Sequence, residues 1–236
     1  MEPLAIEKDL AARAAAKRVR SGMRVALGTG STAAYAIRAL AEKFGGRADI
    51  DTVATSSASE SLARDLGLPV RALAEDDRFD LMIDGADEVT PQLALTKGGG
   101  GALFREKFLA RLSNEVVIIV DHTKLVDRLA TRAPIPVEVV PFARPIVARR
   151  LAAKRFGVRL RVDGSGRTVI TQNGNEILDL RPPTPLEDPR QLESELRDEP
   201  GVVESGIFVG LAHRVYVGLP GDRVEEVTPS GRVKEP

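Results

Sequence analysis

Short apolar strand patterns alternate with amphipathic helix patterns through the first half of the chain. Helices are expected at about 7–20, 31–44, 57–66 and 101–112, and strands at 23–27, 50–54, 70–73, 81–83 and 115–120. The strand segments are apolar along nearly their whole length, which is typical of strands covered on both faces. This alternation predicts an α/β fold with a Rossmann-like, mostly parallel sheet.

The pattern changes near Pro134, where a second, smaller α+β domain is expected. An extended proline-bounded segment at 134–141 precedes helices at 145–156 and 189–198 and three antiparallel strands at 158–162, 168–172 and 177–180. Asp163-Gly164 and Asn173-Gly174 are turn pairs that favour hairpins between those strands. The predicted limits are 134–206 for the small domain, with 1–133 and 207–236 forming the Rossmann-like domain. Strands at 207–209 and 215–219 are expected to rejoin the first sheet.

Composition and charge exclude several classes of function. Lys plus Arg and Asp plus Glu each total 34, so no net charge attracts the chain to nucleic acid or anionic lipid. The chain has no Cys and 2 His, which leaves few metal ligands, and we expect no metal and no disulfide. The first 20 residues mix acids and bases without an apolar core, and no aliphatic run is long enough for a membrane span. We therefore expect a cytoplasmic protein.

The first motif with chemical content is Gly28-Thr29-Gly30-Ser31-Thr32-Ala33, between a strand and a helix. Glycines allow close backbone approach, and N–H groups at a helix start attract an anion, so three neighbouring hydroxyls suit a terminal phosphate. Ser31 or Thr32 is placed to cap the helix. The spacing also fits a dinucleotide-binding turn, but that interpretation wants an acid after the next strand, and Asp49 and Asp51 precede it. A plain strand–helix turn is the third alternative.

The second motif is Asp84-Gly85-Ala86-Asp87-Glu88, directly after an apolar strand. Ligands of parallel sheets bind at the carboxyl ends of strands, where two carboxylates three residues apart can face one cleft. Such carboxylates can bind sugar hydroxyls or move a proton. Metal binding and simple turn capping are the alternatives, although neither a Walker-A lysine nor a nearby histidine is present.

The third motif is Lys97-Gly98-Gly99-Gly100-Gly101, followed by Glu106 on the next expected helix. Consecutive glycines cost folding entropy, so they are expected where the backbone approaches another group closely. A carboxylate such as Glu106 can act as a base, and an ammonium with backbone N–H groups can stabilise an oxyanion. An aldose–ketose isomerisation requires these groups, a base and donors that stabilise the negative oxygen. Without the glycine run, Glu106 would be interpreted as a surface residue.

The fourth motif is Asp121-His122-Thr123-Lys124, again beyond an apolar strand. Lys124 can reach the same sheet edge as a phosphate partner. His122 is expected to support the turn rather than to act as a catalyst. With few metal ligands available, enediolate chemistry without a metal fits the motifs better than a metal-assisted hydride shift.

The ordered set of motifs closely resembles the ribose-5-phosphate isomerase A family. The set comprises GTGST, DGADE, KGGGG with REK, DHTK, PIPVEVVPFA and the NGN hairpin, and the resemblance extends from about Lys8 to the end of the chain. It implies a Rossmann-like domain with a small α+β domain, no cofactor, a homodimer or homotetramer, and a place in the non-oxidative pentose phosphate pathway. The implied reaction interconverts ribose 5-phosphate and ribulose 5-phosphate.

The resemblance also implies roles for individual residues. Glu106 matches the catalytic base, and Lys97, Asp84 and Asp87 match residues that contact the sugar, assist ring opening and steady the enediolate. The substrate-binding set is Lys8, Thr29, Gly30, Ser31, Thr32, Asp84, Gly85, Ala86, Asp87, Lys97, Gly98, Gly99, Gly100 and Lys124.

Two other functions use some of the same motifs. An NAD(P)-dependent dehydrogenase would account for the turn at 28–33 but not for the glycine run, Glu106 or Lys124. A sugar-phosphate-sensing domain of a transcription regulator would need a DNA-binding segment, and only about 22 residues precede the first expected strand.

Overall fold

The chain forms two compact units in a computed structural model that describes residues 2–46 and 49–234. Unit 1 comprises residues 1–86, 105–124 and 210–236, and unit 2 comprises residues 87–104 and 125–209. The domain limits predicted from the sequence stay a prediction. Their ranges also include residues 1, 47, 48, 235 and 236, which lie outside the described residues.

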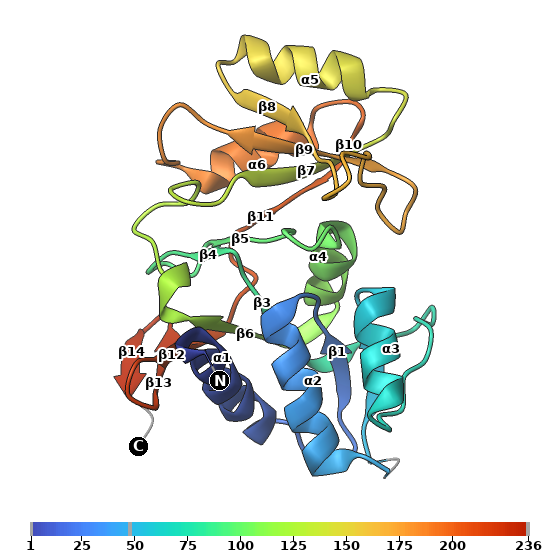
Figure 1. The fold of residues 1–236 in the computed structure, drawn as a ribbon, viewed down its shortest axis with the longest axis vertical. Coiled ribbons are helices and arrows are strands. Elements are labelled where there is room, and N and C mark those ends of the chain that lie inside the picture. The colour runs from blue at the N-terminus through green and yellow to red at the C-terminus, as the bar shows by residue number, and fades with distance from the viewer. Residues whose placement is uncertain (1, 47–48, 235–236) are drawn as a thin grey trace. The chain divides into compact units, whose positions relative to one another are not determined.

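A seven-stranded sheet forms the centre of unit 1 (Figure 1). In spatial order its strands are β14 (Gly231–Lys234), β13 (Arg223–Thr228), β12 (Arg214–Leu219), β6 (Ser113–Asp121), β3 (Phe79–Gly85), β1 (Arg24–Leu27) and β2 (Asp51–Ala54). The five strands from β12 to β2 pair in parallel, whereas β13 and β14 are antiparallel additions at one edge. The predicted α/β fold with a mostly parallel sheet is confirmed.

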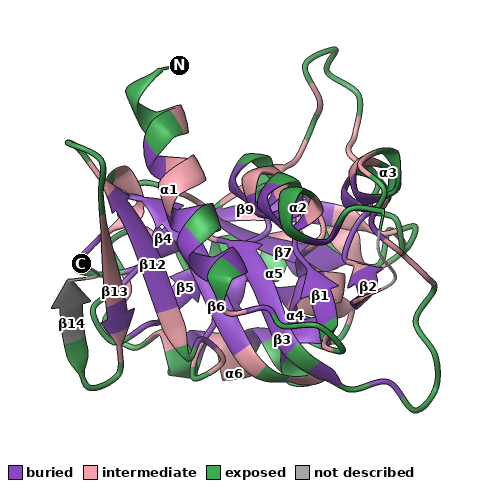
Figure 2. Ribbon diagram, turned by 90° about the horizontal axis from the view of Figure 1, so that it is seen from below, coloured by how far each residue is buried: buried purple, intermediate pink, exposed green. Residues whose placement is uncertain are grey.

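Three helices cover one face of this sheet: α1 (Pro3–Lys17), α2 (Ser31–Phe44) and α3 (Ser57–Asp65). Helix α1 packs on β12 and β6, α2 on β3, and α3 on β2. Figure 2 shows the central strands buried and the outer face of α2 exposed. Helix α1 begins earlier than predicted because Pro3 occupies the first helical turn, where its fixed φ suits a helix and its missing N–H needs no acceptor.

The strand order creates a switch point between β1 and β3. The chain leaves β1 through α2 to reach β2 on one side, and later returns to place β3 on the other side of β1. In open parallel sheets this reversal opens a crevice at the carboxyl ends of the two strands, and small ligands bind there. The loop that begins at Gly28 and the end of β3 at Asp84 lie at this position.

Unit 2 contains two antiparallel sheets. The four-stranded sheet has the order β10 (Val202–Ser205), β7 (Ile135–Val139), β9 (Glu176–Arg181) and β8 (Gly157–Leu160), and the three-stranded sheet has the order β11 (Ile207–Phe208), β5 (Leu95–Thr96) and β4 (Glu88–Val89). Helices α5 (Arg144–Ala153) and α6 (Pro189–Arg197) contact β8 and β10 respectively. Asp188 caps α6 by accepting from the amides of Arg190 and Gln191.

Several predicted elements differ from the structure. Val70–Leu73 is not a strand, because only Val70 bridges to Thr52 and the following residues enter an exposed loop. Residues 168–172 form single bridges at Thr168 and Ile170 rather than a strand. Residues 215–219 join the parallel sheet as predicted, but Ile207 and Phe208 pair with β5 instead. The strands β13 and β14 were not predicted, because their alternating charged residues lack an apolar run.

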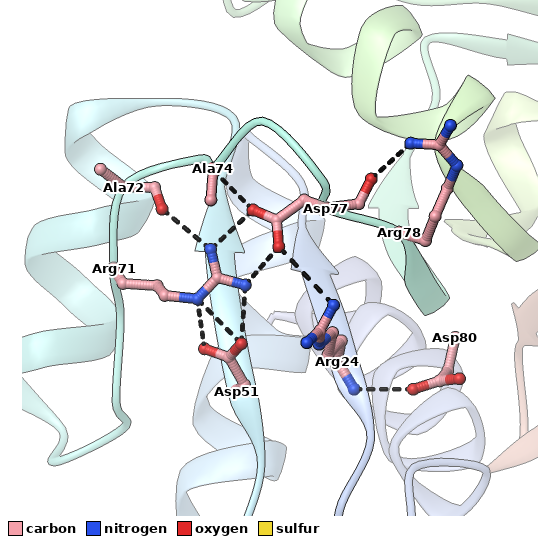
Figure 3. Close-up of polar contacts among 8 residues, drawn as sticks. All are labelled: Arg24, Asp51, Arg71, Ala72, Ala74, Asp77, Arg78 and Asp80. Atoms are coloured by element: carbon pink, nitrogen blue, oxygen red, sulfur yellow. Dashed lines mark hydrogen bonds and ion pairs between the residues drawn. The ribbon is translucent and has the colours of Figure 1, made fainter.

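A cluster of ion pairs stabilises unit 1 at the amino ends of its strands (Figure 3). The Arg71 guanidinium donates to both oxygens of Asp77 at 2.6 and 2.5 Å and to Asp51, the first residue of β2, at 2.8 Å. Asp77 also accepts from the amide of Ala74 at 2.7 Å. These hydrogen bonds, with the Arg71 guanidinium foremost, lower the pKa of the buried Asp77 carboxyl from 3.8 to about 2. The cluster therefore lies at the end of the sheet opposite to Gly28 and Asp84.

Asp77→Asn is expected to lower stability without lowering activity. Because the folded pKa of Asp77 lies below its unfolded value, its charge stabilises the fold above pH 3.8, and this contribution is lost as the pH falls towards about 2. Urea unfolding at pH 7 should show a loss of about 1–3 kcal/mol in the variant. The difference in the free energy of unfolding between the parent protein and the variant should shrink as the pH falls below 4. An equal difference in the free energy of unfolding at every pH would show that the charge of Asp77 does not stabilise the fold.

Candidate active site

Gly28 and Asp84 are in direct contact at the switch point of unit 1. Asp84 is fully buried, and a Cβ atom built on Gly28 would lie 2.0 Å from Asp84 Oδ1. The same oxygen accepts the amide of Thr29 at 3.1 Å and the amide of Gly85 at 2.7 Å. Only glycine therefore fits at position 28. The first and second sequence motifs meet here, as their placement after neighbouring strands predicts.

Helix α2 begins at the glycine-rich loop, with Gly30 as its N-cap at φ +109°. The predicted cap at Ser31 or Thr32 is wrong, because both residues already lie in the first helical turn. Glycine adopts this φ at no steric cost. The first-turn amides of any helix have no intrahelical acceptor. Because Gly30 has no side chain, it does not cap these amides in α2. Lys8 of α1 adds a cation here, since its Nζ donates to Ser31 Oγ at 3.3 Å.

Two further hydroxyl residues hold the glycine-rich loop and were not predicted. Thr55 Oγ1 lies 2.6 Å from Thr29 Oγ1 and also donates to the carbonyl of Leu27. Ser59 Oγ donates to the carbonyl of Gly28 at 2.6 Å. Both follow the end of β2, which shares the carboxyl edge with β1. The position of Thr55 directly after the strand was the signal that could have identified it, whereas Ser59 lies within α3 and had no such signal.

The turn after β6 brings the fourth motif to the same edge of the sheet. Residues His122–Lys124 form a single 3₁₀ turn, η1, which leaves Lys124 half-buried. The buried Asp121 accepts the amide of Thr123 at 3.0 Å. His122 contacts Glu7 of α1, with 2.6 Å between Nδ1 and Oε2.

Unit 2 contains the second half of the predicted residue set. Asp87 Oδ2 accepts the amide of Gly99 at 2.9 Å, and a Cβ atom on Gly99 would lie 2.7 Å from Asp87 Oδ1. Gly98 has φ +97° and packs against Leu103. Asp87 and the glycine run are thus brought together. A side chain at position 99 would push against the Asp87 carboxylate, and one at position 98 would be strained by the positive φ. Gly100 is exposed.

An arginine that the sequence did not indicate supports the glycine run. Arg161 donates to the carbonyls of Gly98 at 2.7 Å and Gly99 at 3.1 Å, and it pairs with Asp179. These contacts fix the carbonyl side of the loop. Nothing in the local sequence distinguishes Arg161 from the many other arginines of the chain.

Lys97 is a buried lysine with 3% exposure. Its amide donates to the carbonyl of Gly206 at 2.8 Å, and its Nζ lies 5.6 Å from the centre of the Phe208 ring. A Cβ atom on Gly206 would lie 2.2 Å from the Lys97 carbonyl oxygen, so a side chain at position 206 would displace the backbone at Lys97. The ring face offers an ammonium group a favourable electrostatic contact.

Glu88, the last acid of the second motif, has a structural role. It is fully buried in unit 2, and its carboxylate accepts the amides of Ala130 at 2.6 Å, Arg132 at 2.5 Å and Ala133 at 2.9 Å. Its acceptor capacity is used on this loop. Of the three acids in the motif, Asp84 and Asp87 are the ones positioned beside glycine-rich loops.

Glu106 is buried, with 2% exposure, in the first turn of α4 (Leu103–Arg111). Its neighbour Lys107 is also buried. The interpretation of Glu106 as a surface residue is therefore wrong. A buried carboxylate is costly unless polar or charged groups compensate it, so such residues are concentrated at functional sites.

Residues 2–46 and 49–234 contain neither a metal-binding cluster nor a membrane-spanning helix. No group of three or more His, Asp or Glu side chains in this part of the chain is arranged to hold a metal ion. No helix among these residues is both long enough and apolar enough to span a bilayer.

Comparison with known proteins gives consistent matches along nearly the whole chain. The family model for ribose 5-phosphate isomerase A (phosphoriboisomerase A) matches residues 51–222. The chain is 48% identical to ribose-5-phosphate isomerase A of Chloroflexus aurantiacus, over 94% of this chain and 93% of that protein. It is 46% identical to the same enzyme of Deinococcus radiodurans, over 97% and 100%.

Solved structures agree with the sequence matches. A ribose 5-phosphate isomerase from Plasmodium falciparum has a TM-score of 0.89 at 32% identity, over 94% of this chain and 97% of that chain. A D-ribose-5-phosphate isomerase in complex with phospho-erythronic acid has a TM-score of 0.88 at 38% identity, over 98% of both chains.

The fold, which matches the solved ribose 5-phosphate isomerases, and the named relatives define the chain as an α/β isomerase. The chain belongs to the ribose 5-phosphate isomerase A family. This membership supports interconversion of ribose 5-phosphate and ribulose 5-phosphate, and it rules out the dehydrogenase and regulator interpretations as the primary function.

Proposed function

We propose that the chain interconverts D-ribose 5-phosphate and D-ribulose 5-phosphate through an enediolate, with Glu106 as the general base. The observation that carries this proposal is the burial of Glu106 in the first turn of the helix that follows the glycine run. A buried carboxylate at that point of the chain is shielded from water and is fixed by a rigid helix. Both conditions favour proton transfer to and from carbon.

The phosphate group is assigned to the start of α2 and to two lysines. Thr29, Gly30, Ser31 and Thr32 offer hydroxyls and helix-start amides, and Lys8 already contacts Ser31. Lys124 adds a second cation at the end of the turn after β6. A helix N-terminus with adjacent ammonium groups is a suitable site for a dianion. The relative solved with phospho-erythronic acid supports a phosphorylated sugar-like ligand in this family.

The sugar is assigned to the two carboxylates and to the glycine run. Asp84 and Asp87 would assist ring opening by moving the proton of the C1 hydroxyl to the ring oxygen. Glu106 would then take the proton from C2 and return it to C1, while a proton passes from O2 to O1. Lys97 and the glycine-run amides would stabilise the negative oxygen of the enediolate. Gly85 and Ala86 complete the proposed contact surface.

The proposed reaction requires no metal or cofactor, and this can be tested directly. Purified protein should convert ribose 5-phosphate to ribulose 5-phosphate in the presence of EDTA at the rate measured without it. Detection of ribulose 5-phosphate by NMR identifies the product unambiguously. Absence of conversion would overturn the function, and a loss of rate with EDTA that a metal restores would overturn the metal-free mechanism.

A homodimer or homotetramer and a cytoplasmic location stay predictions.

Lys124→Ala is expected to raise the KM for ribose 5-phosphate by about tenfold or more while kcat changes little. The reason is that a phosphate distant from C1 and C2 is bound equally in the substrate and in the transition state. Steady-state kinetics measures both constants. Lys154→Ala is the matched control, because Lys154 is an exposed lysine paired with Glu195. A fall in kcat with an unchanged KM would contradict the phosphate assignment.

A further inference from the structure

Glu7 is a buried carboxylate on α1 that no step of the proposed reaction uses. It is only 3% exposed although it lies near the beginning of the helix. Its Oε2 atom lies 2.6 Å from His122 Nδ1 and accepts the amide of His122 at 3.3 Å. Burial of a carboxylate is unfavourable without such partners. The structure therefore ties Glu7 to the turn that follows β6.

The backbone of α1 approaches the sheet closely at the same point. A Cβ atom on Gly218 of β12 would lie 1.9 Å from the carbonyl oxygen of Glu7. Gly218 is the register partner of Asp121, the last residue of β6. Glycine at this position lets α1 lie directly on the strand beside the turn, which places the Glu7 side chain within reach of His122.

Two carboxylates hold the first amides of this turn. Glu7 accepts the amide of His122, and Asp121 accepts the amide and the hydroxyl of Thr123. Both amides donate to protein carboxylates and not towards a ligand. The group of this turn that is suited to bind a phosphate is therefore the Lys124 side chain. The position of Lys124 then depends on how firmly the two carboxylates fix the turn.

The next residue of α1 connects to the same groups. Lys8 Nζ donates to Ser31 Oγ at 3.3 Å and lies 4.0 Å from Asp121 Oδ2. Residues 7 and 8 therefore link α1 to the turn after β6 and to the start of α2. These are the two segments to which the phosphate has been assigned.

We infer that Glu7 is a positioning residue for the phosphate end of the substrate, acting through His122. It holds the turn that carries Lys124 and fixes the point of α1 from which Lys8 extends. This inference rests on the proposed function, because it assumes that Lys124 and Lys8 meet the substrate phosphate. Glu7 itself does not touch the substrate.

The experiment compares Glu7→Ala, Glu7→Gln and His122→Ala with the parent protein. Glu7→Ala is expected to raise the KM for ribose 5-phosphate and the inhibition constant of inorganic phosphate by about tenfold each, with kcat within about threefold. Glu7→Gln keeps an acceptor for the His122 amide and should give a smaller rise. If Glu7 acts through His122, the two substitutions are not additive. The KM of the double variant Glu7→Ala/His122→Ala should therefore not exceed the KM of the more affected single variant.

The control is Glu42→Ala, which removes an exposed carboxylate of α2 that pairs with Arg13 of α1 at 2.6 Å. It should leave both constants unchanged. A Glu7→Gln or Glu7→Ala protein that folds but retains the parent KM and phosphate inhibition overturns the inference, as does a change in kcat alone. A Glu7→Ala protein that fails to fold leaves Glu7→Gln to decide by the same criterion. Failure of the parent protein to convert ribose 5-phosphate would instead overturn the proposed function.

Discussion

Glu106→Gln is expected to lower kcat by about 10²–10⁴-fold and to leave substrate affinity nearly unchanged. Glutamine has almost the same shape as glutamate, so the first turn of α4 should retain its packing around the buried side chain. The amide cannot accept a proton at neutral pH, and both proton transfers between C2 and C1 are therefore lost. The substrate phosphate is assigned to other residues, so its binding should persist.

Three measurements test this expectation together. Steady-state kinetics gives kcat, calorimetric titration with ribose 5-phosphate gives affinity in the nearly inactive variant, and thermal unfolding checks that the fold is retained. The matched control is Glu60→Gln, which changes a partly exposed glutamate in the first turn of α3 that pairs with Arg64. Glu60→Gln should behave like the parent protein. Full turnover by Glu106→Gln would exclude Glu106 as the base.

The sheet of unit 1 was predictable because its signals are local. Each buried parallel strand is a short apolar run, and β1 and β2 are followed by helices that begin after a glycine, Gly30, and a capping serine, Ser56. The same reasoning failed where stability comes from contacts with distant residues. Val70–Leu73 has an apolar composition, but Arg71 turns away to pair with Asp51 and Asp77, and the strand ends after one bridge. The charged strand β13 forms because its backbone pairs with β12 at the edge of the sheet.

The candidate site could be predicted as a set of motifs but not as a set of contacts. Gly28 and Asp84 are 56 residues apart in sequence position, and their contact follows only when β1 and β3 become neighbours. Supporting residues such as Ser59, Arg161 and Glu7 carry no local signal of comparable strength. Each acts over a long sequence separation, and a single sequence does not show which of many polar side chains will be turned inwards.

Gly28→Ala tests the contact between Gly28 and Asp84 in unit 1. The added methyl group would lie 2.0 Å from Oδ1 and 2.1 Å from Cγ of Asp84, well inside van der Waals contact. Asp84 is fully buried in β3 and cannot move into solvent to make room. Either the carboxylate or the loop that carries Thr29 must therefore be displaced. We expect kcat/KM to fall by about 100-fold or more, because a shift of 1 Å in a catalytic group has effects of this size.

The same substitution should lower the free energy of unfolding by about 1–3 kcal/mol, as overpacking of a buried site generally does. Gly164→Ala is the matched control, since a Cβ atom there meets nothing within 4 Å and the residue does not have a positive φ. Kinetics measured well below the unfolding temperature of both variants separates lost geometry from lost fold. If Gly28→Ala retained both the stability and the kcat/KM of the parent protein, Asp84 would not occupy the position from which it is proposed to assist ring opening.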